Sequence, residues 1–273
     1  MPVELCQSNR LTLSGVIVAV LLSVGSALAA TSEDCRAAYH RQDYAEALRL
    51  CRPLAEQGAD VAQTTLGIMY ERGLGGLAQD DAEAVKWYRK AAEQGVAFAQ
   101  DRLAVMYRQG RGGLPQDYAE AAKWVRKSAE QGDAIAQAYL GTLYVRGLGV
   151  AHDYGEAANW FRKAANQGDA PAQWWLGRMY EAGWGVQDYA EAARWYRKAA
   201  DQGYAAGQWH LGLLYEQGYG VQQGYLQAHM WLNLAAAQGN EDAAKARDEL
   251  AAKMTPAQIA EAQRLAQEWK PTK

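Results

Sequence analysis

The order of apolar and polar residues repeats itself along most of this chain. A tripeptide that ends in Gln-Gly recurs with its glycine at positions 58, 95, 132, 168, 203 and 239, so that successive copies lie 35 to 37 residues apart. Between these marks, apolar residues return every three or four positions in two separate stretches, which is the spacing of an amphipathic helix. A fixed period of this length is typical of repeat proteins. The sequence therefore predicts five copies of a two-helix unit.

Each copy also carries signals for where its two helices begin and end. The first helix contains the pattern Ala-Gln-x-x-Leu-Gly-x-φ-Tyr, in which φ is apolar, and ends at a glycine, which tolerates a left-handed backbone. The second helix begins at an Asp with a Glu three residues later, which predicts a capping box with reciprocal side-chain to backbone bonds. The glycines are Gly73, Gly110, Gly147, Gly183 and Gly218; the pairs are Asp80–Glu83, Asp117–Glu120, Asp153–Glu156 and Asp188–Glu191, with Gly224 and Gln227 in the fifth copy.

These units resemble the Sel-one-like repeat (SLR), a relative of the tetratricopeptide repeat. The similarity rests on Leu-Gly-x-φ-Tyr, Gly-x-Gly, Asp-Tyr-x-Glu-Ala and Trp-Tyr-x-Lys-Ala-Ala, and it extends over roughly residues 59–239. The chain departs from the pattern at Ala104, which replaces the first-helix glycine, and at Gln222-Gln223-Gly224, where Asp-Tyr is usual. The resemblance implies an all-α fold, a right-handed α-solenoid of stacked antiparallel helix pairs. Stacking also follows from physics, because one hairpin alone cannot bury both of its apolar faces.

The repeats divide the chain into a leader, two end caps and a central array. We expect a signal peptide over residues 1–29, an N-terminal capping hairpin over 30–58 and C-terminal capping helices over 240–273. Thr255 and Gln258 predict a capping box at the start of the last helix. The five repeats are expected at residues 59–95, 96–132, 133–168, 169–203 and 204–239.

The N-terminal segment has the character of an export signal. Residues 11–30 carry no charge and end in small residues that fit an A-x-A cleavage site at Ala27-Leu28-Ala29. Cleavage there releases a mature chain that begins at Ala30 or Thr31 in the periplasm or outside the cell, as in exported bacterial members of the family. The alternative is an uncleaved membrane anchor, because 20 uncharged residues just reach spanning length. No membrane span is expected after cleavage.

The export prediction changes the meaning of the cysteines. Cys6 leaves with the signal peptide, and Cys35 and Cys51 remain as an even number in an oxidising compartment. They lie eight residues before and after Asp43, near which the capping hairpin is expected to turn. Residues placed symmetrically about such a turn face each other, so we predict a disulfide between them. Two buried free thiols are the alternative.

Composition and motifs argue against several functions. The chain has 28 Lys and Arg against 31 Asp and Glu, which disfavours a nucleic-acid binder that works by bulk positive charge. The four histidines lie outside any H-E-x-x-H pattern, and no P-loop or G-x-S-x-G motif occurs. We therefore expect no catalytic residues, no cofactor and no metal. Some cysteine-rich SLR proteins are associated with β-lactam binding, so an envelope hydrolase or β-lactam-binding protein is the alternative class; this chain has only one such cysteine pair.

A binding surface is the remaining expectation. On a helical wheel, the face opposite the buried columns of the first helices lines the concave groove in this family. It presents Thr64, Ile68, Glu71, Arg72, Asp101, Val105, Arg108, Gln109, Thr142, Val145, Arg146, Trp174, Arg178, Glu181, Trp209, Leu213 and Glu216, with Trp175 and His210 at its edge. Trp174 and Trp209 suggest an aromatic platform with nearby charges, as in interaction hot spots; packing between adjacent first helices is the alternative.

The sequence thus favours a non-enzymatic exported scaffold. It is expected to hold another envelope protein or a peptide, with a glycan ligand on the tryptophans as a further option. Bacterial SLR proteins are commonly linked to envelope regulation, exopolysaccharide or motility control, and host contact, and the sequence does not select among these processes.

Overall fold

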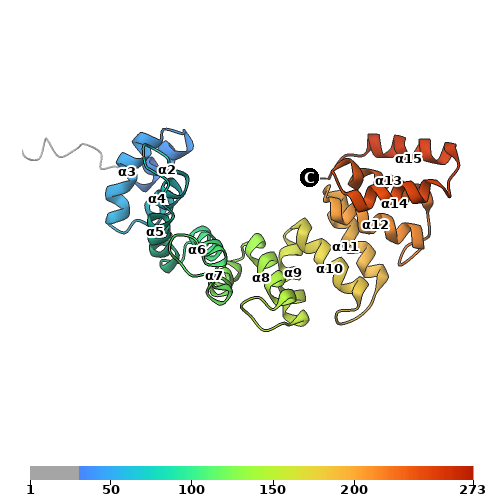
Figure 1. Ribbon diagram of the computed structural model, residues 1–273, viewed down its shortest axis with the longest axis horizontal. Helices are drawn as coiled ribbons and strands as arrows, with labels where there is room; N and C mark the ends of the chain where they lie inside the picture. The colour runs from blue at the N-terminus through green and yellow to red at the C-terminus, as the bar shows by residue number, and fades with distance from the viewer. Residues whose placement is uncertain (1–30, 273) are drawn as a thin grey trace, which may run out of the picture.

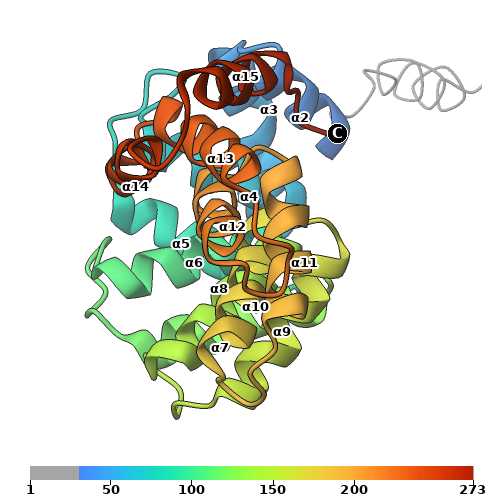
Figure 2. The ribbon, with the colours of Figure 1, turned by 90° about the vertical axis from the view of Figure 1, so that its right-hand side faces the viewer.

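The computed structural model describes residues 31–272, and the predicted signal peptide over residues 1–29 lies outside this part of the chain. The described residues form fourteen helices and no strands. Consecutive helices pack as antiparallel pairs, and the pairs stack into an open arc with α2 and α3 at one end and α15 at the other (Figure 1). The pairs also differ in direction, so the stack is twisted as well as curved (Figure 2). This is the α-solenoid that the repeats predict.

The first helix of each copy is an even-numbered element and the second helix is the odd-numbered element that follows. The helices are α2 (Ser32–His40), α3 (Tyr44–Glu56), α4 (Asp60–Arg72), α5 (Asp81–Glu93), α6 (Ala97–Gln109), α7 (Tyr118–Glu130), α8 (Ala134–Arg146), α9 (Tyr154–Asn166), α10 (Ala170–Ala182), α11 (Tyr189–Asp201), α12 (Ala205–Gln217), α13 (Tyr225–Ala237), α14 (Glu241–Ala251) and α15 (Pro256–Glu268). Among these helices, none is long and apolar enough to cross a membrane.

The helix ends are fixed by local chemistry. Each of the five first helices stops at its predicted glycine, which adopts a left-handed conformation with φ between 63° and 74°. In each of the four predicted Asp–Glu pairs, the Asp side chain accepts a hydrogen bond from the backbone N–H of the Glu. The cap therefore satisfies one of the free donors at the start of the second helix.

The reciprocal half of these capping boxes is absent, which corrects the sequence prediction. The backbone N–H of Asp80 already donates to the carbonyl of Tyr70, and Asp117, Asp153 and Asp188 make the equivalent bond to the tyrosine of their own first helix. The Glu side chain therefore has no donor to satisfy. In three copies it pairs instead with a cation one turn further along, as Glu83 does with Lys86 at 2.5 Å. The predicted box at Thr255 and Gln258 is complete.

A glycine in the middle of most first helices allows close contact with the second helix. A Cβ atom at Gly67, Gly141 or Gly177 would lie 2.7 Å or less from the ring of Tyr88, Phe161 or Tyr196, respectively. The second copy has Val125 in place of the ring and Ala104 in place of the glycine. The unusual alanine is therefore explained by the smaller side chain that faces it.

Pairs of glutamines join one copy to the next. The buried Gln of each first helix donates to a carbonyl in the last turn of the preceding second helix, as Gln137 does to Ala129 at 3.0 Å. Its own side-chain oxygen accepts a bond from the Gln that ends the second helix of the same copy, as from Gln167 at 2.9 Å. The other buried members are Gln63, Gln100, Gln173 and Gln208. The Gln-Gly mark in the sequence therefore has a structural role at every boundary.

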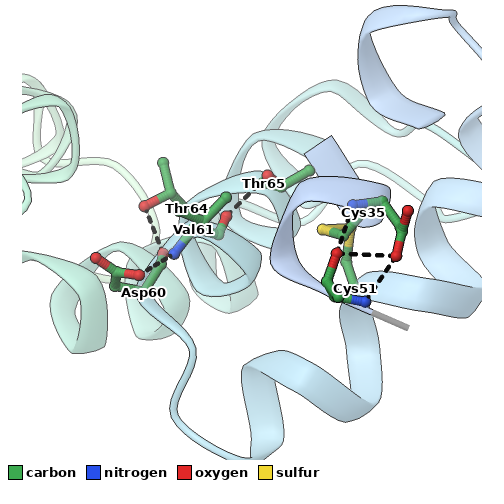
Figure 3. Close-up of a disulfide and its surroundings, with 8 residues drawn as sticks. Cys35, Cys51, Asp60, Val61, Thr64 and Thr65 are labelled. Atoms are coloured by element: carbon green, nitrogen blue, oxygen red, sulfur yellow. Dashed lines mark hydrogen bonds between the residues drawn. A yellow bond between two sulfur atoms is a disulfide. The ribbon is translucent and has the colours of Figure 1, made fainter. Parts of the chain in front are cut away.

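Both ends of the array are tied down. Cys35 of α2 and Cys51 of α3 form the predicted disulfide, with their Cα atoms 5.0 Å apart, beside the start of α4 (Figure 3). At the other end, the backbone N–H of Thr272 donates to the carbonyl of Asp201 at 2.7 Å, and the ring of Trp269 packs edge-on against Trp231. An end copy has only one neighbour to pack against, so these ties add contacts where the stack lacks them.

Candidate binding surface

Some of the even-numbered helices contact the equivalent helix of the neighbouring pair directly. Such contacts join α2 to α4, α10 to α12 and α12 to α14. In a curved stack, neighbouring copies approach most closely on the inner side of the curve. The side chains that project from these helices, away from the second helices, are therefore the candidates for a continuous binding surface.

His210, which the helical wheel places at the edge of the exposed face, lies at the centre of the tryptophan cluster. Its ring lies 4.6 Å from that of Trp209, 5.9 Å from that of Trp174 and 5.0 Å from that of Tyr196, with which it stacks. His210 is buried, because the rings that surround it come from three different helices. Trp174 and Trp209 are each half-buried. They therefore contribute both to packing and to the surface.

Glu181 is the acidic member of this cluster. One of its carboxylate oxygens accepts a hydrogen bond from the hydroxyl of Tyr196 at 2.5 Å and lies 3.5 Å from Nδ1 of His210 and 3.8 Å from Nε of Arg178. Burial opposes the negative charge of Glu181, but the contacts with His210 and Tyr196 outweigh this effect and lower its pKa. Glu181 therefore stays ionised in the folded chain at neutral pH.

The same cluster holds an unusual number of buried nitrogens without a hydrogen-bond partner. Five of the nine buried, unpartnered side-chain N and O atoms in residues 31–272 belong to it. They are Nε1 of Trp174, Nε of Arg178, Nε1 of Trp209 and both ring nitrogens of His210. A buried polar group without a partner costs about 1–3 kcal/mol, and such groups are rare in folded proteins. Nδ1 of His210 and Nε of Arg178 nevertheless face the Glu181 carboxylate, so only the two indole N–H groups and Nε2 of His210 have neither a hydrogen bond nor an ion-pair contact within residues 31–272.

Two further predicted residues belong to the C-terminal end of the surface. Leu213 packs with Trp209 against the cluster that includes Leu232 and Leu250. Glu216 accepts a hydrogen bond from Lys253 at 2.9 Å, so the C-terminal cap neutralises its charge. These contacts attach α12 to the C-terminal cap.

Asp101, Arg108 and Arg146 lie apart from the tryptophans. Burial raises the pKa of Asp101 to about 6, and the negative charge of Asp133 adds to the rise. The guanidinium of Arg108 lies over the ring of Tyr139, 5.5 Å from its centroid. Arg146 is exposed and makes no ion pair with any residue in 31–272. The structure thus separates the predicted residues into a tryptophan group in α10 and α12 and a polar group in α6 and α8.

The N-terminal part of the surface contains an apolar groove. Thr64 and Ile68 line a cavity of about 250 Å³ together with Tyr39, Val61 and Phe98. The hydroxyls of Thr64 and Thr65 each donate to a backbone carbonyl one turn earlier, at 2.8 Å (Figure 3). The hydroxyl donors of both threonines are therefore already used in hydrogen bonds within α4. The remaining members of the predicted face, Arg72, Val105, Gln109, Thr142 and Val145, are half-buried or exposed on their helices, and Trp175 stacks on Phe161 with ring centroids 5.4 Å apart.

Glu71 is wrongly predicted as a surface residue. It is buried, accepts a hydrogen bond from the hydroxyl of Tyr88 at 2.8 Å, and pairs with Arg102 and Arg111 of the next copy. The sequence does hold a signal for this network. The residue after the tyrosine of the first helix is Glu only in the first, fourth and fifth copies. The second helices of these copies carry Tyr88, Tyr196 and Leu232, and the hydroxyls of Tyr88 and Tyr196 each bond to the Glu of their own copy. A comparison between copies could therefore have assigned Glu71 to the interior.

The architecture and the side-chain clusters together indicate a class of protein. The described residues form a repeat solenoid. The polar network of Glu71 is buried between two copies, and a second polar cluster lies around Trp174 and Trp209. No group of three or more His, Cys, Asp or Glu that could hold a metal ion occurs within residues 31–272. These features are those of a binding scaffold.

The Sel1 repeat model matches residues 37–58, 60–96, 97–133, 134–169, 170–204 and 205–240, and the chain belongs to this family. The first of these segments, 37–58, lies in the hairpin that the sequence analysis treats as a cap.

Two crystal structures are similar to this chain over most of its length. One is a protective antigen of uropathogenic Escherichia coli that displays an SLR fold, with 36% identity, a TM-score of 0.77 and coverage of 92% of this chain. This chain spans only 56% of that protein. The other is a Sel1 repeat protein from Oxalobacter formigenes, with 31% identity, a TM-score of 0.75 and coverage of 89% of this chain and 98% of that one. A search of curated proteins found no match. Sel1 repeats generally mediate protein–protein interaction and are typically non-catalytic scaffolds.

Proposed function

We propose that this protein is an exported, non-enzymatic scaffold that binds a segment of another envelope protein, and that the cluster of Trp174, Arg178, Glu181, Trp209 and His210 is the centre of the binding surface. The observation that carries this proposal is that two half-buried tryptophans, Trp174 and Trp209, gather there beside Arg178 and the ionised Glu181. Tryptophan and arginine in a partly desolvated setting are the residue types that dominate binding energy in protein interfaces.

The chemistry of the cluster indicates what kind of segment it takes. The guanidinium group of Arg178 is a donor, so it favours carbonyl or carboxylate oxygens of a partner. The guanidinium of Arg178 already lies over the ring of Trp174, 5.9 Å from its centroid, which holds both side chains in place. Asp101, Arg108 and Arg146 lie further along the same face and extend the surface towards the N-terminus. A peptide backbone with interspersed apolar side chains fits this combination of rings and donors.

Export is supported by two independent features. Residues 11–30 carry no charge and end at a small-residue cleavage pattern, and Cys35 and Cys51 form a disulfide, which persists in oxidising compartments. N-terminal sequencing of protein from the extracytoplasmic fraction tests this part of the proposal. We expect Ala30 or Thr31 as the first residue; an intact Met1 on a membrane-bound form would show that the segment is an anchor.

The binding proposal is tested by affinity capture from the extracytoplasmic fraction with three forms of the protein. We expect a partner that is retained by the wild type, lost by Trp174→Ala/Trp209→Ala, and retained by Trp195→Ala. Trp195 is a matched control because it is also half-buried but lies on a second helix, where Lys198 covers its ring at 3.9 Å. Circular dichroism must show similar helicity for all three forms. Equal capture by all forms, or a large loss of melting temperature for the double variant alone, contradicts the proposal and favours a packing role.

The alternative class from the sequence is a hydrolase or β-lactam-binding protein. A nitrocefin and peptidoglycan assay on the purified mature protein separates it from the scaffold. We expect no turnover above the uncatalysed rate, and turnover at enzyme-like rates would overturn the scaffold proposal.

A further inference from the structure

The boundary between the third and fourth copies contains a cavity of about 260 Å³. Its walls come from α9, α10 and the loop that follows α10, and they include the rings of Tyr154, Tyr180 and Trp184. Met179 and Leu176 form much of its apolar lining, and Arg162 lies at its side. This cavity is distinct from the tryptophan cluster around His210, because the two share no residue.

The cavity exists because one loop is shorter than its counterparts. Residues 183–188 connect α10 to α11, whereas the longer segments 147–153 and 218–224 connect the corresponding helices of the third and fifth copies. In four copies the second loop glycine lies directly against the second helix of the preceding copy. A Cβ atom at Gly149 or Gly220 would lie about 2 Å from the carbonyl oxygen of Tyr118 or Tyr189. A Cβ atom at Gly185 would meet no atom within 4 Å, so this loop stands away from α9.

Two side chains that fill the corresponding space elsewhere are missing here. Val150 and Val221 of the third and fifth copies pack against the core, whereas Val186 of the fourth copy is 71% exposed. Gly155 of α9 occupies a column that holds alanine in three copies, at Ala82, Ala119 and Ala190, and Leu226 in the fifth. The short loop and Gly155 together leave the space open.

Arg162, which lies beside the cavity, also lacks the hydrogen bond to a tyrosine that its equivalents make. In the first, second and fourth copies, the arginine of this column donates to the tyrosine hydroxyl of the next first helix, as Arg126 does to Tyr144 at 2.5 Å and Arg89 to Tyr107 at 2.9 Å. The fifth copy has Asn233 at this position. Arg162 is the equivalent residue facing Tyr180. It is exposed and makes no hydrogen bond or ion pair with any residue in 31–272. The cavity therefore has an apolar interior and a free guanidinium at one side.

We propose that this cavity binds a small aromatic carboxylate, with its ring against Trp184, Tyr180 and Met179 and its carboxylate on the guanidinium of Arg162. Aromatic walls favour an aromatic ring, and Trp184 is held in position because it stacks on Tyr154 with ring centroids 4.6 Å apart. Arginine binds carboxylates through two parallel hydrogen bonds. At about 260 Å³ the cavity is slightly smaller than typical small-molecule sites of about 300–1,000 Å³, so we expect one small ring system with a short acid arm.

Isothermal titration of the mature protein with indole-3-acetate and with the uncharged indole-3-acetamide tests this proposal. We expect one site per chain, with the amide at least tenfold weaker than the acid because it lacks the charge-assisted bonds to Arg162. Arg162→Gln should weaken binding of the acid by about tenfold or more and leave binding of the amide unchanged. Arg126→Gln is the matched control, since Arg126 is the same residue one copy earlier and is paired with Tyr144. It should bind both probes as the wild type does.

Two variants close the cavity with sequence borrowed from other copies. Gly155→Leu introduces the residue of the fifth copy, and a loop graft replaces residues 183–187 by the sequence of residues 147–152. Both should abolish binding of indole-3-acetate: Gly155→Leu because its side chain fills the cavity, and the graft because its longer loop can close against α9 and lacks Trp184. The melting temperature of Gly155→Leu should stay equal or rise. Absence of binding to the wild type at millimolar acid, or equal binding to the wild type, Arg162→Gln and the graft, would overturn the proposal. Neither result depends on the tryptophan surface, which Trp174→Ala/Trp209→Ala tests separately.

Discussion

Replacing Gly141 by alanine puts a methyl group where the structure has the ring of Phe161. A Cβ atom at this position would lie 2.7 Å from Cε1, 2.8 Å from Cδ1 and 3.0 Å from Cζ of that ring. Carbon atoms pack comfortably at about 3.5–4.0 Å, so α8 and α9 must separate by roughly 1 Å or the ring must leave its rotamer. Phe161 is fully buried, and neither adjustment is free.

The magnitude follows from two opposing effects. Overpacking of this kind costs about 1–3 kcal/mol, and a rigid ring lies towards the upper end. Alanine in a helix interior gains about 1 kcal/mol over glycine. We therefore expect Gly141→Ala to reduce the free energy of unfolding by about 1–2 kcal/mol. In a Phe161→Val background the clash is removed, so the same substitution should raise the free energy of unfolding by up to about 1 kcal/mol.

Urea unfolding followed by circular dichroism measures the four members of this double-mutant cycle. The second copy already has the compensated pair, Ala104 with Val125, which is why we choose valine. Phe161→Val alone leaves a cavity and should be destabilising, so only the change of sign of Gly141→Ala between backgrounds is diagnostic. Ala104→Gly serves as a control and should cost about 1 kcal/mol with no packing gain. If Gly141→Ala is equally destabilising in both backgrounds, the steric explanation is wrong.

Three further predictions concern other parts of the chain. Reduction of the Cys35–Cys51 disulfide should lower stability by up to about 3 kcal/mol, the chain-entropy limit for a loop of this length; melting with and without dithiothreitol measures it, and Cys35→Ser/Cys51→Ser should show no effect of the reductant. The pKa of Asp101 is about 6 in the folded chain against 3.8 for the free side chain, so stability is lost as the pH rises from 4 to 6. Asp101→Asn should therefore raise the melting temperature at pH 7.5 and have little effect below about pH 4; equal effects at both pH values would contradict this assignment. Deletion of residues 133–168 should leave a shorter helical array, because Gln173 then meets the carbonyl of Ala129 that Gln137 now binds. Deletion of residues 133–150 should unfold the chain, and the idea of separable copies fails if both deletions unfold alike.

The periodic part of the fold could be predicted because its signals are local. Gly73 and its counterparts end helices through their own backbone conformation, and Asp80 and its counterparts cap helices through an adjacent N–H. The pairing of Cys35 with Cys51 was predictable for a similar reason, since both lie within one hairpin. Each of these features needs only a few neighbouring residues to be assigned.

Features that depend on two copies at once were not predicted. Glu71 lies on the outer face of a helical wheel, yet Tyr88 and two arginines of the next copy cover it. His210 was assigned to an edge because the wheel of α12 does not include Trp174 and Tyr196 from neighbouring helices. The cavity beside Arg162 depends on a loop that is one residue shorter than the loop of the third copy, a difference that becomes visible only when the copies are aligned.

The glutamine pairs have a consequence for the conditions under which this array keeps its shape. An amide neither gains nor loses a proton between acid and alkaline solution, and dissolved ions do not screen a bond between two neutral groups. The bonds from each buried glutamine to the preceding copy, such as that of Gln137 to the carbonyl of Ala129, are therefore the same in fresh water and in brine. Ion pairs between copies, such as that of Glu71 with Arg102, weaken as salt rises, whereas the glutamine bonds that align the copies do not.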